Sequence, residues 1–414
     1  MPPRSTRTSP PPAARPGSVP RSTRRSRRDH RTRPAREFGI PTTVKELREY
    51  LQAALEVEHL TLPVYMTGLY SIRPGTNRTA HFAIRSVLME EMLHMTLAAN
   101  LLNAVGGTPR VGRKEFVAEY PARLPFSSPQ LPAIGLQHFS PAALKTFLLI
   151  ERPRKMAPNP KPGEGWTSIG QFYDSIRQGL EHLVAQHGAA AIFTGRPERQ
   201  VGPEDFYNSG GEVFAVHDLK SAQLAIRVIS DQGEGTDGTI WDSDDLIFGE
   251  ARQLAHYFRF NEIYTGRSYG PHDTPDAPPS GPLLDVTWDD AYPIHGDSKV
   301  ADYKKYEQTS AVYGHAVAFN TRYAALLSYL QSAFDGWPRA MALAVPTMLE
   351  LRDRSEQLYR NPHPDPTLAA EGLFASPTFE VEQPQFEAVR DTVDENLRLA
   401  GLEAGEPIDL SLTS

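Results

Sequence analysis

A glutamate and a histidine three residues apart, inside a long apolar segment, are the feature that most constrains this chain. Residues 79–107 carry aliphatic side chains at steps of three and four, which predicts one long helix, and Glu91 and His94 fall on its apolar face. A carboxylate buried among aliphatic side chains costs several kcal/mol unless a partner neutralises it. Such a pair on an inward helix face is how carboxylate-bridged iron and manganese sites are built in four-helix bundles, although an isolated pair can equally be a Glu–Arg ion pair beside a core histidine.

The preceding segment supplies a third candidate ligand. Residues 43–72 open with a capping-box pattern at Thr43, and Glu58 falls within the apolar series of the helix that follows. A short turn at Pro74 joins the two helices, so we expect them to pack antiparallel. Glu58 and Glu91 lie at similar distances from that turn and should meet at one depth. Three ligands in one layer favour a metal site over the ion-pair alternative.

Composition limits which metal chemistry is available. The chain has 414 residues, of which 40% are hydrophobic and 22% charged, as in an ordinary globular protein. No apolar run is long enough to span a bilayer, so we expect no membrane association. The absence of cysteine excludes disulfides, zinc–thiolate sites and cysteine-ligated iron–sulfur clusters. A metal would therefore be held by His, Asp and Glu, which suits iron, manganese or zinc.

The first 36 residues differ from the rest of the chain. They hold eleven Arg and one Asp, a local charge of +10. Because the net charge of the whole chain is −7, the other residues together carry −17. This leader is rich in Pro, Ser and Thr and is expected to be disordered. Its paired arginines lack the hydrophobic segment of an export signal, so we expect a cytoplasmic protein. The leader is either a tail for nucleic acid or an anionic surface, or a plain extension; the acidic remainder argues against nucleic acid as the main partner.

Further helices, separated by long Pro/Gly-rich connections, complete an all-α prediction. Their expected ranges are 140–153, 167–187, 217–232, 243–265, 299–334, 337–360 and 384–400. The expected division is a leader at 1–36, a metal-binding helical domain at 37–265, a linker at 266–298, a C-terminal helical extension packed on the bundle at 299–400, and a tail at 401–414.

Two more carboxylates stand in unusual places. Glu151 follows the apolar stripe of the helix at 140–153, although Arg152 or Arg154 offers it an ordinary ion pair. Glu234 comes between two glycines at the end of the helix at 217–232. The negative end of a helix dipole disfavours a carboxylate, so Glu234 suggests a cation partner, with an exposed loop acid as the alternative.

An ordered series of motifs resembles a known family. The runs LQAALEVEHLTLPVYMTGLYSI, EEMLHMTLAANLLNAVGG, FLLIERP, SAQLAIRVISDQGEG, LAHYFRFNEI and GLFASPTFEV, spread over about residues 43–381, are similar to the ferritin-like family that includes the iminophenyl-pyruvate dimer synthase domain. That domain acts in pigment pathways of the violacein and indolocarbazole type, where it couples two imines of an aryl pyruvate oxidatively. The resemblance implies a ferritin-like helical bundle with additional C-terminal helices.

Carried onto this sequence, the resemblance implies a metal site in two halves. The first half is Glu58, Glu91 and His94, and the second is Glu234 and His256, with Glu151 as the next candidate. Gln253 stands three residues before His256 where a second Glu-x-x-His motif would have glutamate, so a mononuclear site stays open beside a dinuclear one. Tyr65, on the stripe after Glu58, is either a catalytic hydrogen-bond donor or redox-active group, or a core tyrosine.

Three functional hypotheses follow. The leading one is a non-haem iron oxidoreductase that uses dioxygen or peroxide to oxidise a small organic substrate, such as an aryl-pyruvate imine. The second is a haem-dependent coupling enzyme with His94, His256 or His315 as axial ligand. The third is a metal-binding or metal-free scaffold without catalysis. In each case a homo-oligomer is compatible with the sequence.

Overall fold

The described part of the chain is helical. The computed structural model describes residues 38–161, 163–206, 213–236 and 238–401, and within these ranges it contains helices and isolated β-bridges but no strand. This confirms the all-α prediction. The expectations for the leader at 1–36 and for the tail concern residues outside the described ranges, apart from residue 401. No described helix has the length and apolar character needed to cross a membrane.

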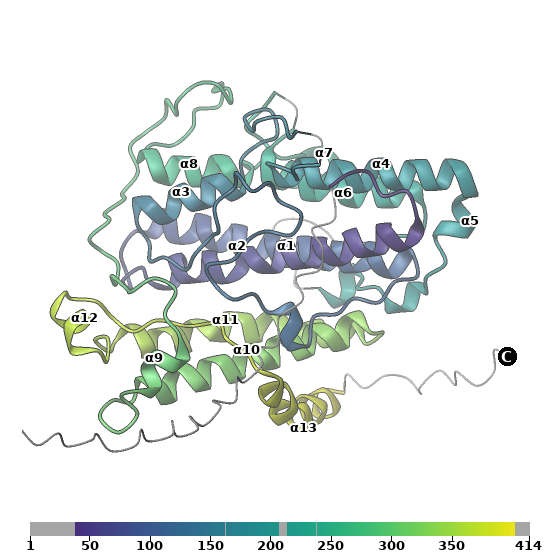
Figure 1. Ribbon diagram of the computed structural model, residues 1–414. Coiled ribbons are helices and arrows are strands. Elements are labelled where there is room, and N and C mark those ends of the chain that lie inside the picture. The colour runs from purple at the N-terminus through teal and green to yellow at the C-terminus, as the bar shows by residue number, and fades with distance from the viewer. Residues whose placement is uncertain (1–37, 162, 207–212, 237, 402–414) are drawn as a thin grey trace, which may run out of the picture. The chain divides into compact units, whose positions relative to one another are not determined.

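Two long antiparallel helices, α1 (Val44–Tyr70) and α2 (Arg78–Ala104), form the centre of the fold (Figure 1). Both begin and end within three residues of their predicted bounds. Thr43 caps α1 by accepting the backbone N–H of Glu46. In the middle of both helices the residues are buried all round, so these helices are covered on every side rather than on one face.

Four shorter helices cover the central pair, α3 (Pro141–Ile150), α4 (Ile169–His187), α6 (Leu219–Glu234) and α8 (His256–Thr265). Helix α3 packs on α8 and α4 packs on α6, and each of the four also contacts α1 or α2. Figure 1 shows α3 and α8 over one end of the central pair and α4 and α6 over the other. The bundle therefore consists of two continuous helices and two interrupted ones, and the interruptions fall at mid-length.

The remaining short elements lie in the connections. They are η1 (Lys114–Phe116), α5 (Ala189–Ile192), η2 (Pro197–Arg199), η3 (Pro203–Asp205) and α7 (Asp244–Ile247). The segment 195–215 holds η2 and η3 and no longer helix in its described part.

The C-terminal elements form a further layer against the central pair (Figure 1). They are α9 (Val300–Lys304), α10 (Val312–Phe334), η4 (Pro338–Ala340), α11 (Met341–Tyr359), α12 (Pro366–Ala370) and α13 (Gln383–Leu399). Helix α10 packs on α11, α13 and α2, and α11 packs on α1. The described residues from 38 onward belong to one compact unit.

Two long helices of the prediction are wrong. The segment 243–265 is helical only at its two ends, because Gly249 takes a positive φ of 73° and the backbone N–H of Ala255 bonds to the carbonyl of Ile240, which closes a loop. The segment 299–334 is interrupted after Lys304. There, Ser310 accepts the N–H of Val312 and starts a new helix.

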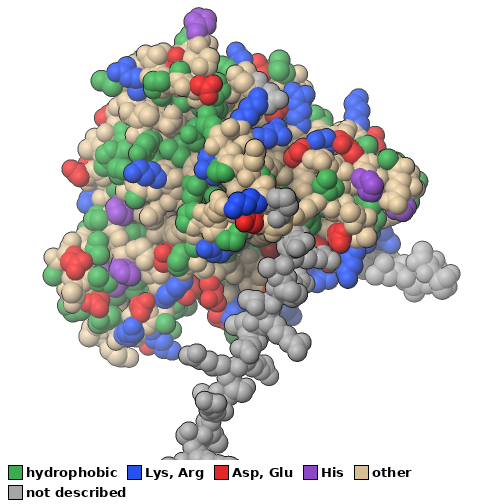
Figure 2. Space-filling view, turned by 45° about the horizontal axis from the view of Figure 1, so that its top comes forward, with side chains coloured by type: hydrophobic (Ala, Val, Ile, Leu, Met, Phe, Trp, Pro, Cys, Tyr) green, Lys and Arg blue, Asp and Glu red, His purple; other side chains and the backbone are tan. Residues whose placement is uncertain are grey.

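Charges of both signs share the surface. On the face in Figure 2, Lys and Arg side chains lie among Asp and Glu side chains. Mixed charge of this kind is typical of an ordinary solvated surface.

Candidate metal centre

Glu58, Glu91 and His94 meet at mid-length of the central helix pair. All three side chains are buried, with 2% exposure each. The Nδ1 atom of His94 lies 3.6 Å from Oε2 of Glu58 and 3.8 Å from Oε1 of Glu91. The three groups therefore converge at one depth, as expected from the similar distances of Glu58 and Glu91 from the turn between the helices.

The interrupted helices contribute Glu151 and His256. Glu151 is the C-cap residue of α3, and His256 is the first residue of α8. Nδ1 of His256 lies 3.1 Å from Oε1 of Glu91 and 3.6 Å from Oε2 of Glu151. Glu91, His94 and His256 each offer a ligand atom within 4.8 Å of the others. Oε1 of Glu91 therefore faces both imidazoles.

The outer nitrogen of each imidazole is held by a hydrogen bond. Nε2 of His94 lies 2.7 Å from Oε1 of Gln232, whose amide nitrogen donates to Asp244. Because Oε1 can only accept, Nε2 of His94 carries a proton, and Nδ1 faces the carboxylates of Glu58 and Glu91. Nε2 of His256 lies 2.7 Å from Oε2 of Glu90. Histidines that bind metals are commonly oriented in this way, through their other nitrogen.

Glu90 is a buried charge that the sequence analysis missed. It is 1% exposed, and Arg259 donates to its second oxygen at 2.7 Å. Burial would raise the pKa of Glu90, but Arg259 and His256 outweigh burial and lower it. Glu90 therefore stays ionised and fixes the ring of His256 without facing the site itself.

Three hydroxyl groups hold the carboxylates. Tyr173 donates to Oε1 of Glu58 at 2.5 Å, Thr61 donates to Oε2 of Glu91 at 2.7 Å, and Tyr65 donates to Glu151. Burial, followed by the charge of Glu151, raises the pKa of Tyr65 well above its ordinary value, so its hydroxyl remains protonated. These donors fix one oxygen of each carboxylate and leave the other turned toward the imidazoles.

The charge balance of the site favours a cation. Burial, followed by the carboxylate of Glu151, raises the pKa of Glu91 to about 7. Burial alone would lower the pKa of His256, but the carboxylates around it raise it well above its usual value. Nδ1 of His256 is buried and faces Glu91 at 3.1 Å, but the contact lacks the geometry of a hydrogen bond. Buried carboxylates around two imidazole nitrogens fit a transition-metal ion with oxygen and nitrogen ligands.

Glu234 lies at the rim of this cluster. It lines the same small cavity, but the backbone N–H of Gly170 donates to one of its oxygens at 2.7 Å and that of Arg154 to the other at 3.0 Å. Because Gly170 lies in the first turn of α4, Glu234 occupies the anion position at that helix N-terminus. The positive partners of Glu234 are therefore the N-terminus of α4 and the side chain of Arg154.

The cavity at the centre is small. Its volume is about 20 Å³, which suits an ion and about one water molecule. The rings of His94 and His256 are 5.3 Å apart and stacked, and His315 lies on α10, outside the cluster. No porphyrin ring fits between His94 and His256 in this cavity.

Comparison with known proteins identifies the family to which this fold is similar. A family model described as ferritin-like matches residues 51–265. The chain is 26% identical over 335 residues to dichlorochromopyrrolate synthase from Lentzea aerocolonigenes, and the match covers 73% of this chain and 30% of that protein. The chain therefore spans less than a third of the length of this curated relative.

A solved structure has the same architecture. The crystal structure of a ferritin-like protein from Caulobacter vibrioides superposes with a TM-score of 0.53 and 22% identity, covering 82% of this chain and 99% of that chain. The match to the family model extends over more than half of the chain and includes every residue of the cluster. This chain belongs to the ferritin-like family.

Proposed function

We propose that this chain is a non-haem iron oxidoreductase. Its iron, as one or two ions, would be held by the five groups that converge at mid-bundle: Glu58, Glu91, His94, Glu151 and His256. Three carboxylates and two imidazoles without thiolate form a ligand set that suits iron or manganese. Two sets of ligands sharing Glu91 support a dinuclear site, although the second Glu-x-x-His motif is missing.

One observation carries this proposal. Both imidazoles turn Nδ1 toward Glu91, while their Nε2 atoms are held from behind by Gln232 and Glu90. Nδ1 of His256 lies 3.1 Å from Oε1 of Glu91 without forming a hydrogen bond of ordinary geometry, so a metal-free hydrogen-bond network does not account for its position. Orientation of both rings toward a common point is what metal ligation requires.

The surrounding residues support redox chemistry at such a site. Bound iron would supply one-electron exchange with dioxygen or peroxide. Tyr65 keeps its proton and donates a hydrogen bond to Glu151, and Thr61 fixes the orientation of Glu91. The buried setting excludes bulk water, which protects reactive species from side reactions.

The substrate that we propose is an aryl-pyruvate imine. Support comes from the similarity to dichlorochromopyrrolate synthase and from the motif series described above. Coupling two such molecules forms one C–C bond, breaks two C–H bonds and releases two electrons and two protons. Hydrogen peroxide would accept them and be reduced to two molecules of water.

Activity can be tested with imines made in place. An L-amino-acid oxidase acting on tryptophan or phenylalanine generates the imine and peroxide together, and mass spectrometry follows the coupled dimer. We expect dimer with the iron-loaded protein and at least a hundredfold less with His94→Ala. Iron-loaded protein that yields no dimer above the oxidase-only control would contradict the coupling activity, while its iron content would still report on the metal site.

A further inference from the structure

A second cavity lies at the far end of the central helix pair. It measures about 200 Å³ and is formed by the turn between α1 and α2 together with one face of α11. Tyr70 lies twelve residues beyond Glu58 on α1, which places the cavity about 18 Å along the helix from the metal centre. The proposed iron chemistry does not use it.

The charges that line this cavity are mainly positive. Arg73, Arg78 and Arg352 line it, and the one carboxylate among the lining residues, Glu356, already pairs with Arg352 at 3.3 Å and with Arg360 at 2.9 Å. In the described ranges, no carboxylate lies within ion-pair distance of Arg73 or Arg78, although Arg73 lies over the ring of Tyr292. The cavity thus has an excess of guanidinium groups without acidic partners.

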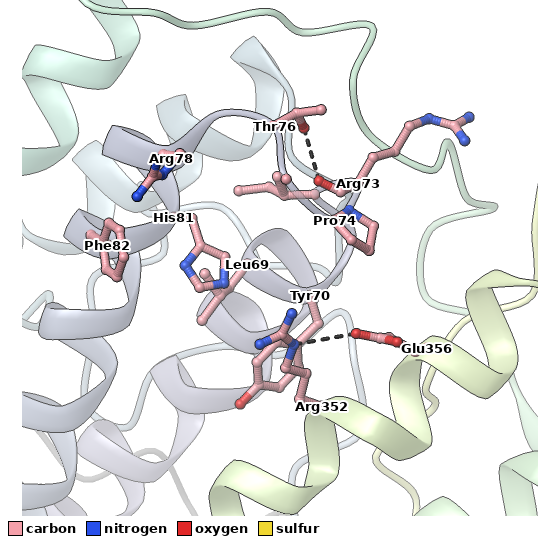
Figure 3. A pocket seen from close by; sticks show the side chains of 12 residues that line it. Leu69, Tyr70, Arg73, Pro74, Thr76, Arg78, His81, Phe82, Arg352 and Glu356 are labelled. Atoms are coloured by element: carbon pink, nitrogen blue, oxygen red, sulfur yellow. Dashed lines mark hydrogen bonds and ion pairs between the residues drawn. The ribbon is translucent and has the colours of Figure 1, made fainter.

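The neighbouring histidine reports the same positive potential. Burial, followed by the charges of Arg352 and Arg85, lowers the pKa of His81. Figure 3 shows Arg78, His81 and Phe82 on α2 facing Tyr70 and Arg352 across the cavity. An anion between these two walls would meet donors from both sides.

Tyr70 lines the cavity with part of its side chain, which is 7% exposed. Its hydroxyl is buried and is turned away from Arg73 and Arg78 (Figure 3). Burial raises the pKa of Tyr70, so the ring adds no negative charge to the cavity.

Apolar side chains complete the cavity. Phe82 is 59% exposed, which is unusual for a large aromatic side chain, and Leu69 and Ile72 also line the space. We propose that this cavity binds a small organic anion, a carboxylate on an apolar body, with the carboxylate at Arg78 and Arg352 and the body against Phe82. Arginine is well suited to a carboxylate.

Calorimetric titration of the full-length protein with benzoate tests this site. Benzamide serves as the neutral analogue of the same shape. We expect benzoate to bind at least tenfold more tightly than benzamide, because a hydrogen bond to a charged group is worth more than one to a neutral group. Arg78→Gln and Arg352→Gln should each weaken benzoate binding about tenfold, and Arg354→Gln, on the same helix as Arg352 but outside the cavity, should leave it unchanged.

Several results would overturn the inference. Equal binding of benzoate and benzamide would show an apolar cavity without anion selectivity. Wild-type affinity in both Arg78→Gln and Arg352→Gln would place benzoate elsewhere, and loss of binding after iron removal with EDTA would place it at the metal centre. Inorganic phosphate that binds as tightly as benzoate would show a plain anion site without use for the apolar wall. Arg78→Gln should melt no lower than wild type, because Arg78 is exposed and has no acidic partner among the described residues, so weaker binding in this variant cannot be ascribed to misfolding.

Discussion

At the scale of single residues, the outer partners of the two histidines decide what the centre can do. His94 is oriented by the neutral amide of Gln232, whereas His256 is oriented by the ionised carboxylate of Glu90. A carboxylate partner makes an imidazole a stronger ligand than an amide does. The two halves of the centre should therefore bind metal with different strength.

Glu90→Gln tests this at one residue. The substitution keeps the shape of the side chain but removes the charge behind His256, so we expect metal affinity to fall by about 10–100-fold, measured by competition with a chelator. Arg259→Gln is the matched control, because it breaks the same buried ion pair and leaves the bond from Glu90 to His256 in place. Equal metal loss in both variants would mean that the ion pair, and not the orientation of His256, is what matters.

His59 makes stability depend on pH. Burial lowers its pKa from 6.5 to about 3, so the folded protein holds it neutral, and Tyr323 lies 2.5 Å from its Nε2. Its contribution is complete above pH 6.5 and is lost as the pH falls from there toward 3, at up to about 1.4 kcal/mol per pH unit. Denaturant unfolding of metal-free wild type and His59→Gln should differ in slope over that window. Parallel curves would rule out this role.

The sequence could predict only part of the centre at this scale. Glu58, Glu91 and His94 stand out because they interrupt apolar stripes, and the short turn between their helices fixes their common depth. Glu90 was not predicted because it lies beside the apolar stripe of its helix, not on it. The middle of α2 is buried all round, so a residue next to the stripe is as deep as one on it.

At the scale of elements, the interrupted helices shape the centre. Helices α3 and α6 end, and α4 and α8 begin, at the level of the cluster, so Glu151 and His256 come from helix ends. The hydrophobic pattern of the sequence did not predict where loops interrupt these helices. The stretch 243–265 has helical composition, and its break depends on Gly249 and on a long-range backbone bond from Ala255 to Ile240.

Substitution of Glu234 tests whether this residue stabilises the start of α4 or binds the metal. Because it accepts backbone N–H groups at the start of α4, we expect Glu234→Ala to lower the free energy of unfolding by about 0.5–2 kcal/mol while the metal content stays at the wild-type level. Glu234→Gln, which retains one acceptor oxygen, should lose less stability. Metal loss in Glu234→Ala at a temperature where the variant is folded would make Glu234 a ligand after all.

At the scale of the whole molecule, the C-terminal helices complete the core of the bundle. Tyr323 contacts His59, the carbonyl of Phe334 accepts from Asn103, and Gln331 accepts from the backbone of Val111. The similarity to known motifs identified these helices as additions, but composition gave no indication of which buried polar groups they would satisfy. Their position against α1 and α2 depends on these long-range pairs.

Truncation tests how far the bundle depends on them. A chain ending at residue 299 would leave His59 and Asn103 without these partners and would expose the apolar faces that α10 and α11 cover. We expect this chain to lose its cooperative thermal transition. A chain ending at residue 382 lacks only α13 and the tail and should keep the transition at a lower temperature. Wild-type melting of the shorter chain would show that residues up to 299 fold independently.

The metal itself is the most direct test of the account. Elemental analysis of protein purified without chelator should find one to two iron ions per chain in the wild type and less than a tenth of that in Glu91→Ala and in His94→Ala, with circular dichroism showing that both variants remain helical. Full metal content in either variant, or a wild-type protein that binds no transition metal when iron is offered under anaerobic conditions, would contradict the assignment of this cluster as a metal centre.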